Sequence, residues 1–388
     1  TLTALFAATI GIAQTDIKKV LAYSTISQLG YMFMGCGVAA YSAGIFHLMT
    51  HAFFKGLLFL AAGSVIHSIG GEQDMRKMGG LRTKIPWTFW TMTAATVAIA
   101  GIPPFAGFFS KDEILWQAYS SAHGSWVYWL IGVITAFITS FYMFRLWFLT
   151  FFGEYRGAAS QEHAEAEHTG RGAHLGGDDP QVAAAVSHGH GHGGIHESPR
   201  VMLVPLVILA VLSVIGGWVG YHSMFENFLA PVFRSGIAVS AETAQAAGSI
   251  QPHPEAGSTE NLLMGISIAA ALAGFLFAWL LYHRRPDLPR RLAIALDGLY
   301  QAVLNKYYVD ELYAILFVKP LINGSRQLLW QGIDQHVIDA TVDNGAEGAR
   351  HLSDAVRHMQ SGNIRSYAGW VAVGAAAIIV YMVWIGVR

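Results

Sequence analysis

Three ionisable side chains recur at regular spacing within one long apolar run, residues 43–67. His47, His51 and Lys55 stand at positions i, i+4 and i+8, so on a helix of 3.6 residues per turn they form one polar stripe. A charge at the centre of a bilayer costs roughly 2.5–3.5 kcal/mol, which makes each of them a functional candidate. Imidazoles titrate near neutral pH and can relay protons through water. The stripe predicts a proton pathway; the alternative is a set of buried histidines that hydrogen-bond to helix backbones.

A second candidate site lies in GIPPFAGFFSKDEIL, residues 101–115. Gly101, Pro103 and Pro104 predict a helix break, because proline lacks the backbone N–H and forces the chain out of the helix. Broken helices in transporters direct helix ends and free carbonyls at a mid-membrane ion site. We expect Lys111 to lose and regain a proton there, and Asp112 to stabilise its charged form. The alternative is a helix end whose charged side chains extend to the membrane surface.

A third polar stretch is QTDIKKVLAYSTISQLGYM, residues 14–32. Lys18 stands at the start of the predicted helix, and Ser24, Gln28 and Tyr31 fall on one of its faces. Their hydroxyl and amide groups are sufficient to hold a file of water. The alternative is that they hydrogen-bond to neighbouring helices, as such residues do in many membrane proteins.

The sequence predicts no metal or redox centre on this chain. The single cysteine, Cys36, excludes an intrachain disulfide and cannot supply the four thiolates of a typical iron–sulfur cluster. The run HGHGHGGIH, residues 188–196, lacks the ligand spacing of a structural zinc site, so we interpret the Gly- and His-rich segment 153–199 as a solvated loop. A strand–GxGxxG–helix unit for a dinucleotide is also absent from the sequence.

Composition indicates a membrane protein. Of the 388 residues, 53% are hydrophobic and 13% are charged, against roughly 25% charged in soluble domains. The formal net charge of −1 argues against nucleic acid as a partner. Apolar runs long enough to cross a bilayer, the first of them truncated, cover residues 2–13, 17–39, 43–67, 87–118, 126–152, 201–221, 262–282 and 367–387.

Lysine and arginine are concentrated in alternate loops, which orients the predicted spans with the basic side toward the cytoplasm or matrix. Residues 286–360 differ from these spans, because they are charged throughout and carry apolar residues at helical spacing. A helix of roughly 75 residues would reach ~110 Å, more than any bilayer thickness. We expect an amphipathic lateral helix along the membrane surface or along neighbouring proteins, interrupted at Lys319–Pro320 and at Gly324.

The polar motifs at 14–32, 43–67 and 101–115, in this order along the chain, resemble the consecutive motifs of the antiporter-like membrane subunits of respiratory complex I and of Mrp-type sodium/proton antiporters. NKYYVDELYAILFVKP, residues 305–320, resembles the lateral helix of the complex I members. The resemblance covers essentially the whole chain and is weakest at 153–199 and 235–260.

The resemblance implies an all-α, polytopic bundle of transmembrane helices with one discontinuous helix. Residues 1–152 would form most of the second of two inverted repeats, with its discontinuous helix at 87–118, and 153–199 a cytoplasmic-side loop. Residues 200–283 would add two transmembrane helices joined by a loop at 222–260, followed by the lateral helix 286–360 and a transmembrane anchor at 366–388. Because the chain opens inside an apolar run without methionine, we expect a C-terminal fragment. Because the first repeat is absent from it, we expect that the fragment cannot pump by itself.

Residue by residue, the resemblance assigns the family's connecting lysine to Lys18 and its central histidines to His47 and His51. The adjoining lysine falls on Lys55, and the terminal lysine with its acidic neighbour on Lys111 and Asp112. The glutamate–lysine pair of the first repeat has no counterpart in this sequence.

The predicted function is that of a proton-translocating subunit of an NADH:quinone oxidoreductase (EC 7.1.1.2), in a bacterial inner membrane or, in a eukaryote, the mitochondrial inner membrane. The partners would be other membrane-arm subunits and the lipid bilayer. NADH, FMN, the iron–sulfur clusters and quinone would bind to partner subunits, leaving no cofactor on this chain. One alternative is an Mrp-type Na⁺/H⁺ antiporter subunit without a redox partner. Another is a scaffold whose polar residues have lost their role.

Overall fold

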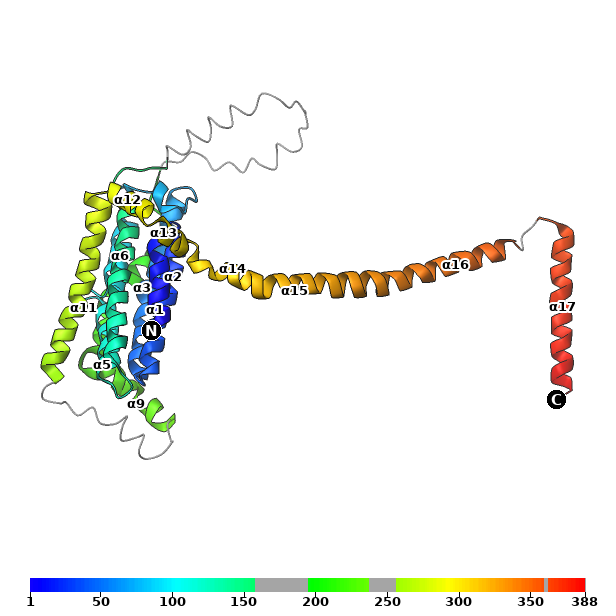
Figure 1. Cartoon of the computed structure of the whole chain (residues 1–388), viewed down its shortest axis with the longest axis horizontal. Coiled ribbons are helices and arrows are strands. Elements are labelled where there is room, and N and C mark those ends of the chain that lie inside the picture. Colours follow the sequence, from blue (N-terminus) through cyan, green and yellow to red (C-terminus); the bar gives the residue numbers. More distant parts are fainter. Residues whose placement is uncertain (158–194, 237–255, 359–361, 388) are drawn as a thin grey trace, which may run out of the picture. The chain divides into compact units, whose positions relative to one another are not determined.

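The computed structural model describes residues 1–157, 195–236, 256–358 and 362–387 (Figure 1). Over these residues the chain is almost entirely helical, and its β structure is an isolated bridge between Asp16 and Asp74. The chain forms two compact units, Thr1–Tyr307 and Tyr308–Arg388, which are described separately below.

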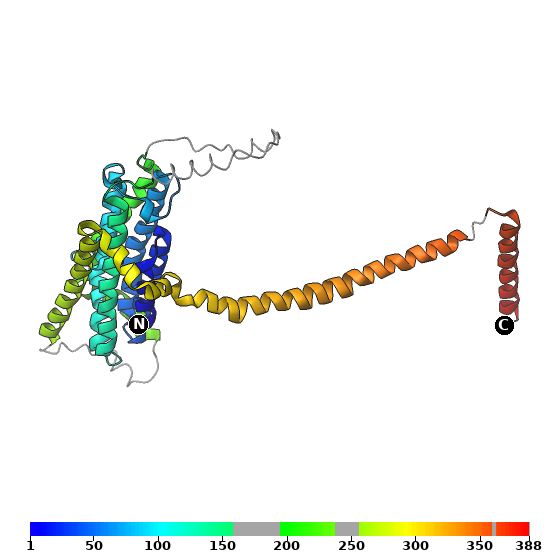
Figure 2. The same ribbon diagram turned by 45° about the horizontal axis from the view of Figure 1, so that its top comes forward.

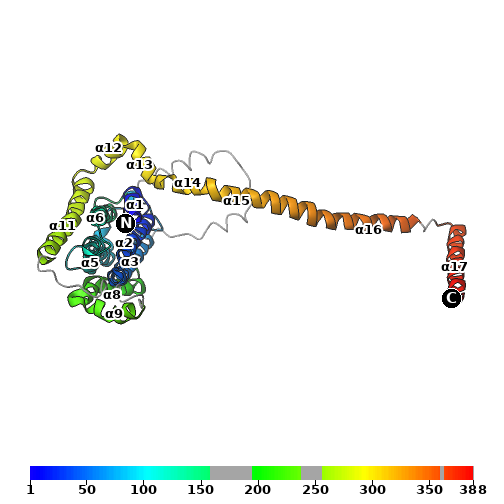
Figure 3. The same ribbon diagram turned by 60° about the horizontal axis from the view of Figure 1, so that its bottom comes forward.

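The first unit is a bundle of helices that lie side by side (Figures 1 and 2). Helix α6 packs against α1, α4, α5 and α11, and helix α3 packs against α2, α4, α5 and α8. Figure 3 shows α11 on one side of this bundle and α8 with α9 on another. The helices are α1 (Leu2–Ala13), α2 (Ile17–Gly37), α3 (Tyr41–Ser68), α4 (Pro86–Ala100), α5 (Ala106–Ser120), α6 (Trp126–Phe151), α8 (Arg200–Ile215), α9 (Met224–Gly236), α11 (Ala256–Trp279), α12 (Asp287–Ala295) and α13 (Asp297–Leu304), with the short turns η1 (Met75–Lys77), η2 (Leu81–Thr83), η3 (Gly216–Ser223), η4 (Leu280–Arg284) and η5 (Lys306–Tyr308).

The predicted helix break is confirmed. Helix α4 ends at Gly101, whose φ of +80° is a left-handed conformation that favours glycine, and α5 begins at Ala106 after the two prolines. Helix α5 then lies very close to the end of α4. A Cβ atom on Gly107 would stand 1.9 Å from the carbonyl oxygen of Ala98, so this contact requires glycine.

Five described helices are long and apolar enough to cross a membrane, at Tyr41–Ser68, Trp126–Phe151, Arg200–Gly220, Gly257–Arg284 and Ile364–Gly386. The predicted span at 17–39 is also a helix, α2, but its lysines, serines and glutamine keep it outside that group. Helices α4 and α5 have 15 residues each, too few for either to cross alone at ~1.5 Å per residue.

The loop between α3 and α4 holds the turn between α1 and α2 in place. The backbone N–H of Ile17 donates to the carbonyl of Gln73 at 3.0 Å, and the N–H of Met75 donates to that of Thr15 at 2.9 Å. These paired bonds fix the start of α2, the helix that carries Lys18, Ser24, Gln28 and Tyr31.

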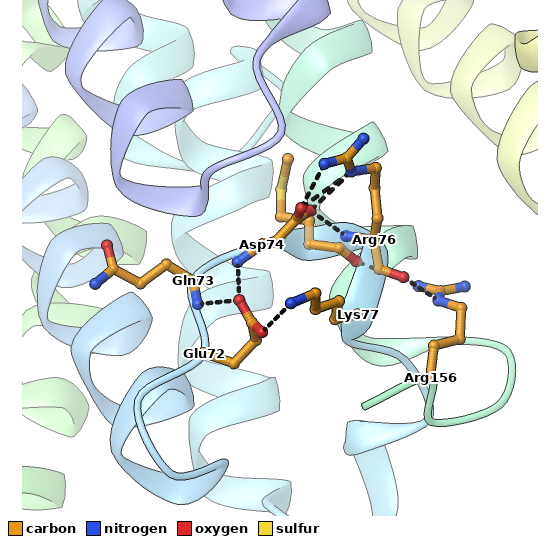
Figure 4. A network of polar contacts seen from close by, with 7 residues as sticks. Glu72, Gln73, Asp74, Arg76, Lys77 and Arg156 are labelled. Atoms are coloured by element: carbon orange, nitrogen blue, oxygen red, sulfur yellow. Dashed lines mark hydrogen bonds and ion pairs between the residues drawn. The ribbon is translucent and has the colours of Figure 1, made fainter. Parts of the chain in front are cut away.

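Charged side chains brace the same loop (Figure 4). Arg76 pairs with Asp74 at 2.6 Å, and Lys77 pairs with Glu72 at 3.1 Å. The backbone N–H of Asp74, which donates to Glu72, and the ammonium of Lys77 hold the pKa of the Glu72 carboxyl below its usual value. Arg156 donates to the carbonyl of Arg76 at 2.9 Å, which ties the end of α6 to this loop.

The first unit ends in a left-handed turn. Lys306 and Tyr307 have φ of +56°, a conformation that costs roughly 1–2 kcal/mol per residue. Tyr307 compensates through α1, because its hydroxyl lies 2.8 Å from Thr9 Oγ1 and its ring stacks on Phe6 with centroids 4.8 Å apart. The turn therefore anchors the chain to the bundle before the second unit begins.

The second unit consists of a long helical stretch and a final apolar helix, α17. The stretch does not break at Lys319–Pro320 or at Gly324, so the interruptions expected there were wrong. The N–H of Lys319 bonds to the carbonyl of Ala314, five residues back, and Pro320 lies in the first turn of α15, where a helix tolerates proline. Within the predicted lateral helix, residues 286–360, the backbone departs from helical geometry instead at Leu296 and at η5, before the second unit begins. The elements are α14 (Val309–Tyr313), η6 (Ala314–Val318), α15 (Lys319–Gly324), η7 (Ser325–Asp339), α16 (Ala340–His358) and α17 (Ile364–Gly386).

Candidate functional site

A hydrogen-bonded polar cluster lies where α2, α3 and α5 meet. His47 of α3 is fully buried, and its two ring nitrogens have partners on different helices. Nδ1 lies 2.9 Å from Ser110 Oγ on α5, and Nε2 lies 3.1 Å from Gln28 Oε1 on α2. Thr50, one turn along α3, completes the cluster with its hydroxyl 2.7 Å from that of Ser110. His47 thus links α3 to the helix that carries Lys111.

His51 and Lys55 continue the stripe along α3, as the spacing predicts. The rings of His47 and His51 have centroids 6.2 Å apart. His51 is 7% exposed and Lys55 is 4% exposed, and within the described part of the chain neither His51 Nε2 nor Lys55 Nζ has a hydrogen-bond partner. Buried polar groups without protein partners are usually satisfied by ordered water. This end of the stripe is therefore where we expect water to enter.

The helix break supplies the partner of Lys111. In a continuous helix the carbonyl of Ile99 would accept from the N–H of residue 103, but Pro103 has none. Lys111 is 3% exposed, and its Nζ donates to that free carbonyl at 2.7 Å. The ammonium also lies 5.5 Å from the ring centroid of Tyr31, a favourable cation–π distance. The helix break thus provides the hydrogen-bond acceptor of Lys111.

Asp112 does not form the expected ion pair with Lys111. Among the described residues, the salt bridges are the two in the α3–α4 loop. Lys111 and Asp112 are neighbours on a helix, so their side chains point about 100° apart. Both side chains instead line a cavity of about 10 Å³, to which Ser267 of α11 also contributes. That volume is close to the minimum for one water molecule. Lys111 and Asp112 therefore share this cavity without forming a salt bridge.

Lys18 lies apart from this cluster. It occupies the exposed first turn of α2, where the carboxylate of Asp16 caps the helix by accepting from its backbone N–H at 2.7 Å. The rest of the predicted polar face of α2 is buried and bonded to neighbouring helices. Ser24 accepts from the hydroxyl of Tyr142 at 2.9 Å, and the hydroxyl of Tyr31 donates to the carbonyl of Gly132 at 2.5 Å. These bonds favour the interhelical interpretation of that face.

Ser110 and Thr50 are the site residues that the sequence interpretation missed. Serine and threonine are common in apolar helices, where they often bond to their own backbone. A usable signal was present in the spacing, since Thr50 follows His47 by three residues and Ser110 directly precedes Lys111.

Within the described ranges, no group of three or more histidine, cysteine or acidic side chains could hold a metal ion. His188, His190 and His192 lie outside those ranges. His196 is described, and it is exposed with its ring centroid 6.0 Å from that of His67.

Comparison with known proteins agrees with the resemblance seen in the motifs. Residues 1–139 match the model of a family described as "NADH:quinone oxidoreductase/Mrp antiporter, TM". NADH-quinone oxidoreductase subunit L of Rhodobacter capsulatus is 38% identical over 99% of this chain and 58% of that protein. NAD(P)H-quinone oxidoreductase chain 5 of Picosynechococcus sp. is 43% identical over 94% of this chain and 52% of that protein.

The chain spans somewhat more than half the length of these relatives. A solved structure of the Mrp complex from Dietzia sp. DQ12-45-1b covers 100% of this chain and 33% of that chain at a TM-score of 0.48 and 21% identity. On the sequence matches, the chain is similar over nearly its whole length to NADH-quinone oxidoreductase subunit L and NAD(P)H-quinone oxidoreductase chain 5, and residues 1–139 match the NADH:quinone oxidoreductase/Mrp antiporter family.

Proposed function

We propose that this chain is part of a proton-translocating membrane subunit of an NADH:quinone oxidoreductase. The observation that carries the proposal is the buried His47, hydrogen-bonded to Ser110 on the helix that presents Lys111 to the carbonyl freed by the break. A pathway for protons needs ionisable groups inside the membrane, held close to polar partners. This cluster supplies both within one helix bundle.

In this function the chemistry on the chain is a change of protonation only. Protons would enter through water at Lys55 and His51, pass to His47, and reach Lys111 beside the helix break. Lys111 would hold the proton while its ammonium bonds to the carbonyl of Ile99, and would release it toward the cavity that Asp112 also lines. Lys18, at the exposed end of α2, would act as a connecting group outside the cluster.

The names of the relatives, which denote one subunit of an oxidoreductase, support the proposal that the redox cofactors bind to other subunits. NADH, FMN, the iron–sulfur clusters and quinone would bind to partner chains, which would drive the proton movement from other parts of the membrane arm. The long helical stretch after Tyr308 is exposed along its length and would rest on those partners at the membrane surface. The membrane would be a bacterial inner membrane, or the mitochondrial inner membrane in a eukaryote.

The test replaces Lys111 by methionine in the full-length protein within its assembled complex. Methionine keeps much of the volume but cannot hold the proton, so we expect proton pumping per NADH oxidised to fall severalfold while the complex still assembles. Lys19→Met, on the exposed side of α2, serves as the matched control and is expected to pump normally.

Normal pumping by an assembled Lys111→Met complex would contradict the proposal. Sodium-dependent proton movement that persists without NADH oxidation would instead favour the Mrp-type antiporter.

A further inference from the structure

We propose that the hydroxyls of Ser110 and Thr50 form a reversible hydrogen-bond chain that satisfies His47 in both its neutral and its charged state. The proposal rests on the proposed function and deepens it, because it names the groups that let His47 gain and lose a proton inside the bundle. Its basis is a set of four distances around one imidazole ring, 2.9, 3.1, 2.7 and 3.1 Å.

The neutral ring has an arrangement that gives both of its nitrogens and both hydroxyls a partner. The amide oxygen of Gln28 can only accept, so Nε2 of His47 carries the hydrogen and Nδ1 has a free lone pair. Ser110 donates its hydroxyl hydrogen to Nδ1 at 2.9 Å. Thr50 in turn donates to the oxygen of Ser110 at 2.7 Å. The chain of donors runs from Thr50 through Ser110 to the ring.

The charged ring reverses that chain. Nδ1 now carries a hydrogen and donates to Ser110 Oγ, which must direct its own hydrogen elsewhere. The oxygen of Thr50 is available at 2.7 Å, and the hydroxyl of Thr50 then turns to the backbone carbonyl of His47 at 3.1 Å. Both ring nitrogens and both hydroxyls again have partners, and the same heavy-atom positions serve the two states.

This arrangement removes one cost of changing the charge of His47, which is the cost of leaving a buried polar group without a hydrogen-bond partner. The gain of one proton at Nδ1 is matched by the rotation of two hydroxyl groups, each of which keeps its own hydrogen. An imidazole buried beside a fixed donor, or beside a fixed acceptor, would instead be held in one state by an unpaired group. Ser110 and Thr50 are therefore positioning residues for proton exchange at His47.

The test uses four variants of the full-length protein in its assembled complex. Thr50→Val keeps the shape of the side chain and removes the hydroxyl, whereas Thr50→Ser keeps the hydroxyl and removes a methyl group. Ser110→Ala removes the other hydroxyl. Thr96→Val is the matched control, because the hydroxyl of that buried residue bonds to the carbonyl of Met92 on its own helix at 2.8 Å.

Thr50→Val and Ser110→Ala are each expected to slow proton pumping per NADH by about tenfold. Thr50→Val leaves the Ser110 hydroxyl only the long bond to the carbonyl of Ala106, 3.4 Å, when the ring is charged, and Ser110→Ala leaves Nδ1 of His47 without its partner in both states. Thr50→Ser should recover most of that rate, and Thr96→Val should pump at the normal rate. If Ser110→Ala prevents assembly, the comparison of Thr50→Val with Thr50→Ser decides the outcome.

Equal pumping by Thr50→Val and Thr50→Ser would overturn the proposal. If Lys111→Met is impaired at the same time, the failure concerns this hydroxyl chain alone. Normal pumping by Lys111→Met would show that the proposed function itself is wrong.

Discussion

Replacing Gly107 by alanine tests how closely α5 must approach the end of α4 for the site to form. The new Cβ would stand 1.9 Å from the carbonyl oxygen of Ala98 and 2.8 Å from its carbonyl carbon, well inside contact distance. Because the opposing atoms belong to the backbone, α5 must move away. Overpacking of this kind costs about 1–3 kcal/mol, only partly offset by the higher helix propensity of alanine, about 1 kcal/mol.

The movement of α5 would also displace Ser110 and Lys111 from their hydrogen-bond partners, since they follow Gly107 by three and four residues on the same face of α5. We expect a lower melting temperature of the assembled complex and slower proton pumping, measured by thermal unfolding and by acidification of membrane vesicles. Gly63→Ala on α3 is the control, because a Cβ there meets no atom within 4 Å, and it should leave both properties near normal. A Gly107→Ala complex with normal stability and pumping would refute the close contact.

Two further predictions follow from the charged residues. Lys111→Glu should pump less than Lys111→Arg, because glutamate gives the Ile99 carbonyl no donor at neutral pH and adds a carboxylate to the cavity that Asp112 lines; equal rates would argue against both effects. Glu72 has a pKa below its usual value, so it stabilises the folded loop above the unfolded pKa and loses this effect as the pH falls through the folded one. The melting temperature of Glu72→Gln should therefore lie below that of the unchanged protein at pH 7, and the gap should close below about pH 4; a gap independent of pH would contradict this.

The helix break and the polar stripe of α3 could be predicted from short stretches of sequence. Pro103 and Pro104, which lack an N–H, together with Gly101 predict the end of α4 without reference to the other helices, and in the structure Gly101 has a φ of +80°. A period of 3.6 residues likewise predicts that His47, His51 and Lys55 share a face. At Pro320 the same rule failed, because the proline lies in the first turn of α15, directly after a π turn, where a helix tolerates it.

Partners across helices could not be predicted in this way. Gln28 lies 19 residues before His47 and Ser110 lies 63 residues after it, so no repeat in the sequence relates them. Their contacts depend on how closely α2, α3 and α5 pack, and this packing is set by small residues such as Gly107 together with the buried surfaces of all three helices. The absence of an ion pair between Lys111 and Asp112 has a local reason, because neighbouring residues on a helix point about 100° apart.

The helix break has a second consequence besides bending the chain. By removing the donor for Ile99, Pro103 leaves a carbonyl dipole inside the bundle that must find another partner. Lys111 lies twelve residues along the chain from that carbonyl and reaches it only because α5 folds back against the end of α4. An ammonium group bound to a neutral carbonyl is stabilised less than one bound to a carboxylate, so its proton is easier to release. The break thus sets both the position and the hydrogen-bond acceptor of the lysine, which under the proposed function would hold and then release a proton.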